Sequence, residues 1–166
     1  MPVAVNEPPR PQRRPLRAPA YDYTTPGAYF VTIVAQERAC LFGAIVDDVF
    51  LPTSAGDAVS RVWHDLPARF QTIELDHFVV MPNHVHGLLW INDVPAPQRE
   101  SLGAIVGAFK SLAAREVNTA LKRTGTLWQR NYYERVVRNE AELTAIRKYI
   151  IDNPLRWAID AENPDR

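Results

Sequence analysis

The apolar residues of this chain fall into short runs bounded by turn residues, a pattern that is typical of β-strands. The run AYFVTIVA after Gly27 is rich in β-branched and aromatic residues and predicts a strand. Two further runs, IELDHFVVM and HVHGLLWI, are separated only by Pro82 and Asn83, and these turn residues predict two neighbouring strands. The passage LFGAIVDDVFL, which precedes them, predicts a short hairpin.

Apolar residues at helical spacing predict three helices. The first begins at Thr53, and Pro67 predicts that its last turn is bent or already finished. The second is long and amphipathic, and residues 124–126, with a central glycine, are expected to end it. The third begins at Asn139, where Glu142 three positions later completes a pairing akin to a capping box, and Pro154 is expected to stop it.

With YERVVR as a further short strand, the element order becomes β, α, β, β, α, β, α. This order predicts an α+β fold with a split βαβ antiparallel sheet, of the ferredoxin-like or RRM-like kind. Helices are expected on one face of the sheet, with an additional C-terminal helix. The folded domain would cover residues 24–157. Residues 1–20 hold six prolines and four arginines and predict a disordered arm, while residues 158–166 predict a short polar tail.

The composition favours a protein of the cytoplasm. The single cysteine, Cys40, excludes an internal disulfide and a cysteine-based zinc site, and neither a signal peptide nor a membrane span is expected. The net charge is zero, but residues 20–109 sum to −6 and residues 110–156 to +5. Such a basic stretch indicates a nucleic-acid partner, although a solvated helix surface would explain it equally well.

The candidate chemistry begins with His84 and His86 on the predicted strand HVHGLLWI. Side chains two positions apart on a strand point to the same face, so both imidazoles can bind one metal ion. A third ligand can come from the last helix, where Tyr149 and Asn153 lie four residues apart on one face. Asn153 offers an amide oxygen to a metal, and Tyr149 a hydroxyl that could act as a nucleophile. Without such partners, a histidine pair on a strand would more often be structural.

The segments MPNHVHGLLWI and WQRNYYERVVRNEAELTAIRKYIIDNP together resemble the HUH single-tyrosine transposases of the smallest insertion sequences. The resemblance is strongest to the transposases associated with repetitive extragenic palindromes, and it covers residues 24–157. It implies an enzyme of DNA transposition and recombination: a metal-dependent endonuclease and strand transferase that acts on single-stranded DNA near a hairpin or palindrome through a 5′-phosphotyrosine. It also implies His84, His86 and Asn153 as metal ligands and Tyr149 as the catalytic nucleophile.

An amide oxygen and the oxygens of a DNA substrate favour a hard ion, so Mg²⁺ or Mn²⁺ is the expected cofactor, in agreement with the resemblance. Tyr132 and Tyr133 are rival nucleophiles, but neither has an amide four residues later. His64 and His77 have no comparable partners and are expected to be ordinary surface or core residues.

The basic stretch supplies candidate DNA contacts. Trp128, Tyr132 and Tyr133 could stack on unpaired bases, although a core position is the more frequent role for a tryptophan. The residues expected to contact phosphates are Lys110, Arg115, Lys122, Arg123, Arg130, Arg138, Arg147 and Lys148. The sequence leaves open whether the protein acts as a monomer or as a homodimer.

Three alternatives remain at this stage. The first is a noncatalytic hairpin-binding protein derived from a transposase. The second is an RNA-recognition domain, which lacks here its usual aromatic strand motif. The third is a metal hydrolase that uses water, for which no carboxylate base is expected near the histidines.

Overall fold

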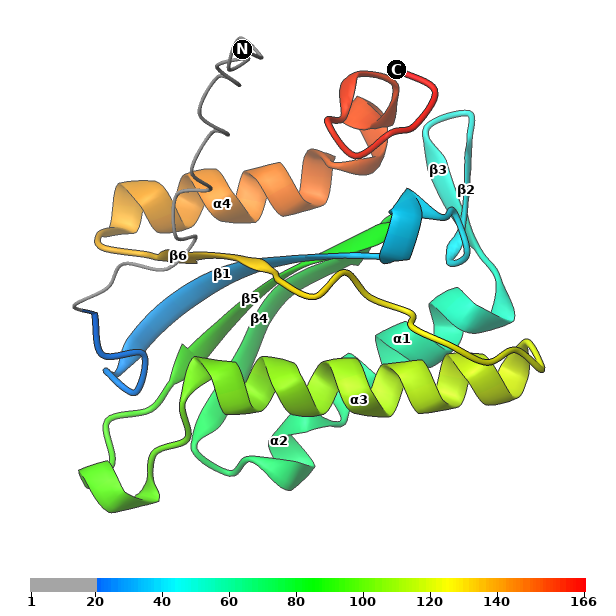
Figure 1. Ribbon diagram of the computed structural model, residues 1–166. Helices are drawn as coiled ribbons and strands as arrows, with labels where there is room; N and C mark the ends of the chain where they lie inside the picture. The colour runs from blue at the N-terminus through cyan, green and yellow to red at the C-terminus, as the bar shows by residue number, and fades with distance from the viewer. Residues whose placement is uncertain (1–20) are drawn as a thin grey trace, which may run out of the picture.

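The protein has an antiparallel sheet between two layers of helix in a computed structural model, which describes residues 21–166 (Figure 1). The spatial order of the strands is β4, β5, β1, β6, and every neighbouring pair is antiparallel. The sheet consists of β1 (Gly27–Val34), β4 (Ile73–Val80), β5 (His84–Ile91) and β6 (Tyr133–Val136). This topology is that of a split βαβ fold, so the predicted α+β class is confirmed.

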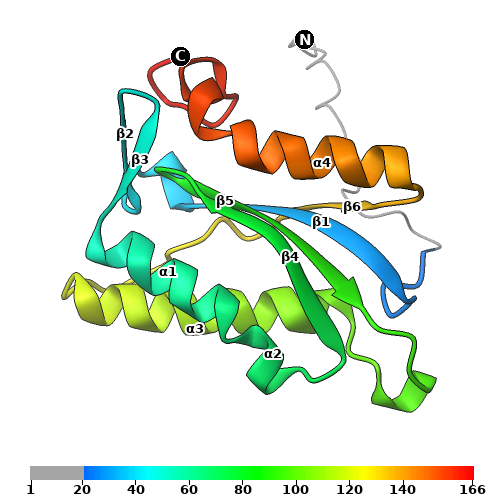
Figure 2. The same cartoon turned by 180° about the vertical axis from the view of Figure 1, so that it is seen from behind.

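The two faces of the sheet are covered by different helices (Figures 1 and 2). One face carries α1 (Ser54–His64), α2 (Leu66–Arg69) and α3 (Leu102–Ala120), and the other carries α4 (Glu140–Asp152). In the central strand β1, Tyr29, Val31 and Ile33 belong to the core under α1 and α3, while Ala28 and Phe30 pack against α4. Because both faces of β1 are buried, its sequence is apolar almost throughout.

Helix α4 is capped at its start and is tied to the sheet at its middle. At its start, Asn139 Oδ1 accepts a hydrogen bond from the Glu142 amide, and the Glu142 carboxylate accepts one from the Arg138 amide. In its middle, Arg147 makes two hydrogen bonds to Asp76 on strand β4. The helix ends at Asp152, and Pro154 begins the short helix η3 (Pro154–Ile159), as the sequence predicts.

The first predicted helix is divided, as Pro67 indicates. Helix α1 ends at His64, Asp65 caps it, and the single turn of α2 carries Pro67 in its first positions. Helix α3 ends at Ala120, a few residues before the segment 124–126 that the sequence suggests. The reason is a Schellman arrangement in which Lys122, with φ of 49°, takes the left-handed position that glycine usually fills, and the Arg123 amide donates to the Asn118 carbonyl.

The predicted hairpin is also present, as a separate two-stranded sheet of β2 (Gly43–Val46) and β3 (Val49–Pro52). Its turn uses Asp47 and Asp48, both with positive φ. Two short helices, η1 (Gln36–Arg38) and η2 (Ala96–Gln98), lie in the connections. None of the helices within residues 21–166 is long and apolar enough to cross a membrane. The predicted arm, residues 1–20, lies outside the described part of the chain.

Candidate metal and tyrosine site

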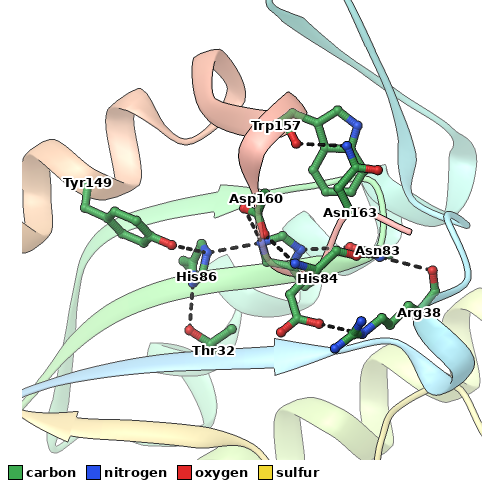
Figure 3. A network of polar contacts seen from close by, with 10 residues as sticks. Thr32, Arg38, Asn83, His84, His86, Tyr149, Trp157, Asp160 and Asn163 are labelled. Carbon is green, nitrogen blue, oxygen red and sulfur yellow. Dashed lines mark hydrogen bonds and ion pairs between the residues drawn. The ribbon is translucent and has the colours of Figure 1, made fainter. Parts of the chain in front are cut away.

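The site lies on the α4 face of the sheet, where β5 brings its two histidines together (Figure 3). Both imidazoles are buried, and their Nε2 atoms are 3.1 Å apart. Two ligand atoms that each lie about 2.1 Å from a metal ion, with a right angle between the two bonds, are roughly 3.0 Å apart. The separation of His84 and His86 therefore fits two neighbouring ligands of one metal ion.

Neighbouring groups hold His84 in the form that a metal requires. The Asn83 Nδ2 group donates to the carbonyl oxygens of Arg38 and Glu162, at 3.0 and 2.7 Å. This fixes the orientation of the Asn83 amide, so its Oδ1 accepts a hydrogen bond from His84 Nδ1 at 2.8 Å. With the proton on Nδ1, the lone pair of Nε2 faces the site.

His86 has a similar partner on the adjacent strand. The register of β1 and β5 places Thr32 opposite His86, and Thr32 Oγ1 lies 2.7 Å from His86 Nδ1. When His86 Nδ1 donates this hydrogen bond, its Nε2 is also free of a proton. Phe30 stacks on the face of the His86 ring, with the ring centroids 5.4 Å apart.

Burial keeps both imidazoles neutral. It lowers the pKa of His84 to about 4, and the nearby Asp160 carboxylate offsets only part of this effect. The pKa of His86 is also well below its ordinary value, because the ring is buried and lies beside His84. Protons therefore do not compete with a metal ion for these nitrogens near neutral pH.

The end of α4 supplies the two other residues that the sequence indicates. Tyr149 Oη is 3.5 Å from His86 Nε2, and the Tyr149 side chain is 37% exposed. Burial raises the pKa of Tyr149, and the opposite effects of Asn153 and Arg156 are smaller. The structure thus brings His84, His86, Tyr149 and Asn153 to one site, as expected, with the tyrosine hydroxyl protonated.

Asn153 shows that the site is suited to a further ligand. Its side chain is only 1% exposed, and although it lies close enough to His84 and Tyr149 to affect their pKa values, neither of its amide atoms makes a hydrogen bond of normal geometry. Leaving a buried polar group unsatisfied costs about 1–3 kcal/mol, so such atoms call for a partner such as a bound ion or an ordered water. Two imidazole nitrogens and one amide oxygen would together be a suitable donor set for a divalent ion.

The sequence interpretation missed Asp160. Its Oδ2 atom lies 3.7 Å from His84 Nε2, and ligand atoms of His84, His86 and Asp160 all lie within 4.8 Å of one another. The expectation that no carboxylate lies near the histidines is therefore wrong. The chain turns back after Pro154 through η3, and no spacing in the sequence indicates this return, although Pro154 does mark where it begins.

The segment 158–166, expected to be a polar tail, packs against the site. The Glu162 carbonyl accepts the hydrogen bond from Asn83, and its carboxylate forms an ion pair with Arg38 at 3.0 Å. Trp157, just before this segment, lies beside the His84 ring. A cavity of about 450 Å³ remains between this segment, α4 and the sheet, and Thr32, His86, Tyr149, Asn153 and Asp160 are among its lining residues.

The expected phosphate-binding residues divide between the two layers. Lys110, Arg115, Lys122 and Arg123 belong to α3 or follow its end, on the sheet face opposite to Tyr149 (Figure 1). The Lys110 ammonium donates to the carbonyl oxygens of Gln129 and Arg130, and Arg123 donates to the Thr126 carbonyl. These contacts give Lys110 and Arg123 structural partners on the far layer.

Of the four remaining basic candidates, three lie on α4 or next to it, whereas the carbonyl of the fourth, Arg130, accepts a hydrogen bond from Lys110 of α3. Arg147 is engaged with Asp76, and Lys148 forms an ion pair with Asp152 at 2.6 Å. Arg138 precedes the helix and is exposed. These three residues share the layer of the site, whereas the other five expected residues do not belong to α4.

Two aromatic expectations can be compared directly with the structure. Trp128 is 4% exposed, packs against Phe42 and Phe109, and donates its indole N–H to the Lys110 carbonyl. The expected core position of this tryptophan is therefore confirmed. Tyr133 is 48% exposed and lines the cavity of the site. His77 contacts Asp76, and neither it nor His64 joins the site.

Comparison with known proteins assigns the chain to a class. A family model described as "Transposase IS200 like" matches residues 50–153, which is more than half of the chain and includes both histidines, Tyr149 and Asn153. The chain belongs to the IS200-like transposase family. The resemblance seen in the sequence is thereby confirmed at the level of the family.

The chain is also similar to two individual proteins, one of which has a name that agrees with this assignment. A Haemophilus influenzae protein of unassigned function is 34% identical to this chain, with 89% of this chain and 91% of the relative covered. A second Haemophilus influenzae protein, provisionally named a REP-associated tyrosine transposase, is 25% identical over 81% of this chain and 74% of its own length.

Two solved structures share the fold. A REP-associated tyrosine transposase bound to a REP hairpin superposes with a TM-score of 0.57 at 19% identity, covering 87% of this chain and 74% of the other. A Deinococcus radiodurans R1 protein, provisionally assigned as a transposase, gives a TM-score of 0.50 at 24% identity, covering 83% and 96%.

Proposed function

We propose that this protein is a metal-dependent endonuclease and strand transferase that acts on single-stranded DNA beside a hairpin or palindrome. The observation that carries the proposal is the convergence of Tyr149, His86 and the unsatisfied Asn153 amide on one cavity, with the neutral imidazole of His84 directly behind His86. A relative solved with a REP hairpin supports hairpin DNA as the partner. The lone Cys40 fits a reaction in the cytoplasm.

The chain's own residues suit phosphoryl transfer. Tyr149 Oη would attack the phosphorus of a phosphodiester, so that a bond from Oη to phosphorus forms and the bond to the 3′ oxygen breaks. The 3′ oxygen leaves as a hydroxyl after taking up a proton, and the 5′ phosphate stays on Tyr149. Because the adduct retains a phosphodiester bond, a second 3′ hydroxyl can reverse the step and join new ends.

A tyrosine with a raised pKa needs help to react at neutral pH, where little phenolate exists. Mg²⁺ or Mn²⁺ bound by His84, His86 and Asn153 would neutralise charge that develops on the phosphate and favour loss of the phenolic proton. Phe30 holds the aromatic ring of Tyr149 edge-on, with the centroids 6.1 Å apart, which limits the positions of the hydroxyl.

A covalent-adduct assay tests the proposal. We expect wild type, incubated with labelled hairpin DNA and Mn²⁺, to form a DNA adduct that survives denaturation. Tyr149→Phe should bind the DNA but form no adduct, whereas the control Tyr132→Phe, which changes a tyrosine outside the cavity, should form it normally. An adduct in Tyr149→Phe would contradict the assignment of the nucleophile.

Asp160 favours a second candidate, a metal-dependent phosphodiesterase in which this carboxylate activates water. Such an enzyme would cut DNA without a covalent intermediate. The same assay separates the two, because Tyr149→Phe would then still release cut DNA. Binding without cutting by wild type on every hairpin tried would instead indicate a noncatalytic hairpin-binding protein.

A further inference from the structure

We propose that the groove between β6 and α4 is a subsite for one unpaired DNA base next to the scissile phosphate, with Tyr133 as its stacking surface. This inference rests on the proposed function and specifies which part of the DNA the protein reads beside the cut. The ligand class is a nucleobase on a single strand.

The strand register places the walls of the groove. Tyr133 is paired with Thr32 and Arg135 with Phe30, so both β6 side chains point to the same face of the sheet as the site. The groove has a volume of about 310 Å³ and is closed on the other side by Ile146 and Ala145 of α4. This volume exceeds that of a single base and leaves room for its sugar.

The groove is continuous with the metal cavity. Phe30, Tyr133 and Tyr149 line both spaces, so the tyrosine hydroxyl that would attack the phosphate stands at their junction. Along a DNA strand, each phosphate is flanked directly by a sugar and a base. A strand whose phosphate reaches Tyr149 Oη therefore presents an adjoining base at the mouth of this groove.

The three aromatic rings form a floor and two walls. Phe30 is 7% exposed and forms the floor. The rings of Tyr133 and Tyr149 stand nearly perpendicular to it, at 70° and 84°, with centroids 6.5 and 6.1 Å from that of Phe30. Exposed aromatic faces beside a phosphate site are the usual means of binding unpaired bases.

The end of the groove away from Tyr149 is polar. Arg135 Nη2 donates to Glu142 Oε1 at 2.6 Å. Hydrogen bonds from the Arg138 amide and from Arg135 lower the pKa of Glu142, so the pair is ionised. The edge of a base in the groove would meet the hydrogen-bond donors of Arg135 and the acceptor oxygens of Glu142. A purely apolar protein-binding groove would not provide these groups.

Fluorescence of 2-aminopurine tests the subsite. The probe is a DNA hairpin with single-stranded arms in which 2-aminopurine replaces one arm base at a time, and the protein is Tyr149→Phe, which cannot cut. We expect quenching at one position beside the cleavage site. Adding Tyr133→Ala should abolish this quenching and weaken binding about tenfold, within the range for loss of one base stack, and Tyr133→Phe should preserve both.

Ile151→Ala is the matched control, because Ile151 is an exposed apolar residue of α4 that lines neither cavity. It should change neither quenching nor affinity. If wild type forms the adduct but no arm position is quenched, or quenching survives Tyr133→Ala, the subsite is refuted while the proposed function stands. If wild type neither binds nor cuts any hairpin, the proposed function fails and the subsite fails with it.

Discussion

At the scale of single residues, the site depends on groups that orient its ligands as much as on the ligands themselves. Asn83 is fully buried, and its amide is fixed by two backbone carbonyls so that its oxygen, an acceptor, faces His84 Nδ1. The sequence predicted His84, His86, Tyr149 and Asn153 because their spacing is local and regular. It could not predict Asp160, because the return of the chain after Pro154 depends on tertiary packing against Asn83 and Arg38.

Removing the Asn83 side-chain oxygen, which accepts the hydrogen bond from His84 Nδ1, should weaken metal binding. In Asn83→Leu, His84 Nδ1 loses its partner, so the proton is no longer held away from Nε2. We expect Mn²⁺ affinity, measured by calorimetry, to fall about 10- to 100-fold. Asn118→Leu, an equal change on the opposite layer, should leave the affinity unaltered. An unchanged affinity in Asn83→Leu would show that this contact does not orient His84.

The histidines also predict how stability depends on pH in the metal-free protein. The pKa of His84 is about 4 in the folded state and about 6.5 when unfolded. The unfolded state therefore binds more protons between these values, and the free energy of unfolding should decrease as the pH falls from about 6.5 to 4. Urea unfolding measures this decrease, and it should be smaller in His84→Gln. A curve of equal slope in wild type and His84→Gln would contradict the assignment.

At the scale of elements, helix α4 matters because it carries Tyr149 and Asn153 to the strand that carries the histidines. Periodicity predicted the helix, its Asn139 cap and its stop at Pro154, since these signals are local. Periodicity did not predict which contact fixes the helix on the sheet. That contact is the pair of hydrogen bonds from Arg147 to Asp76, which occupies an irregular part of β4.

Breaking this contact should affect both stability and the site. Arg147→Met leaves the Asp76 carboxylate, whose side chain is 9% exposed, with only His77 and Trp90 as partners. Because the Arg147 side chain is 37% exposed, we expect only a modest loss in the free energy of unfolding, but one larger than that of the Lys148 control, together with slower adduct formation. Lys148→Met, which removes a more exposed ion pair, should cost under about 0.5 kcal/mol. Equal losses in the two variants would show that the Asp76 contact does not anchor α4.

At the scale of the whole molecule, the fold separates residues that the sequence groups together. The basic stretch 110–156 looks continuous, yet its first part belongs to α3 and its last part to α4, on opposite faces of the sheet (Figure 2). Charge along the sequence predicted a nucleic-acid partner but not which face binds it. The position of the cavity places the proposed DNA path on the α4 face, where Arg156 lines it.

DNA binding should therefore respond differently to changes on the two faces. We expect Arg156→Ala and Arg138→Ala each to weaken hairpin binding severalfold and to reduce the slope of log Kd against log salt by about one. Lys122→Ala, on the opposite layer, should have little effect on either quantity. Titrations at several salt concentrations measure both, and a larger effect from Lys122→Ala would place the DNA on the α3 face.

The central claim is that Tyr149 becomes covalently attached to a 5′ phosphate of DNA, and peptide mass spectrometry of the trapped adduct tests it most directly. Trypsin cuts after Lys148 and Arg156, so Tyr149 is released on a peptide separate from that of Tyr132 and Tyr133, which lie between Arg130 and Arg135. We predict a nucleotide remnant on the peptide of residues 149–156, located on the tyrosine. A remnant on residues 131–135, or cut DNA with no modified peptide, would contradict the account.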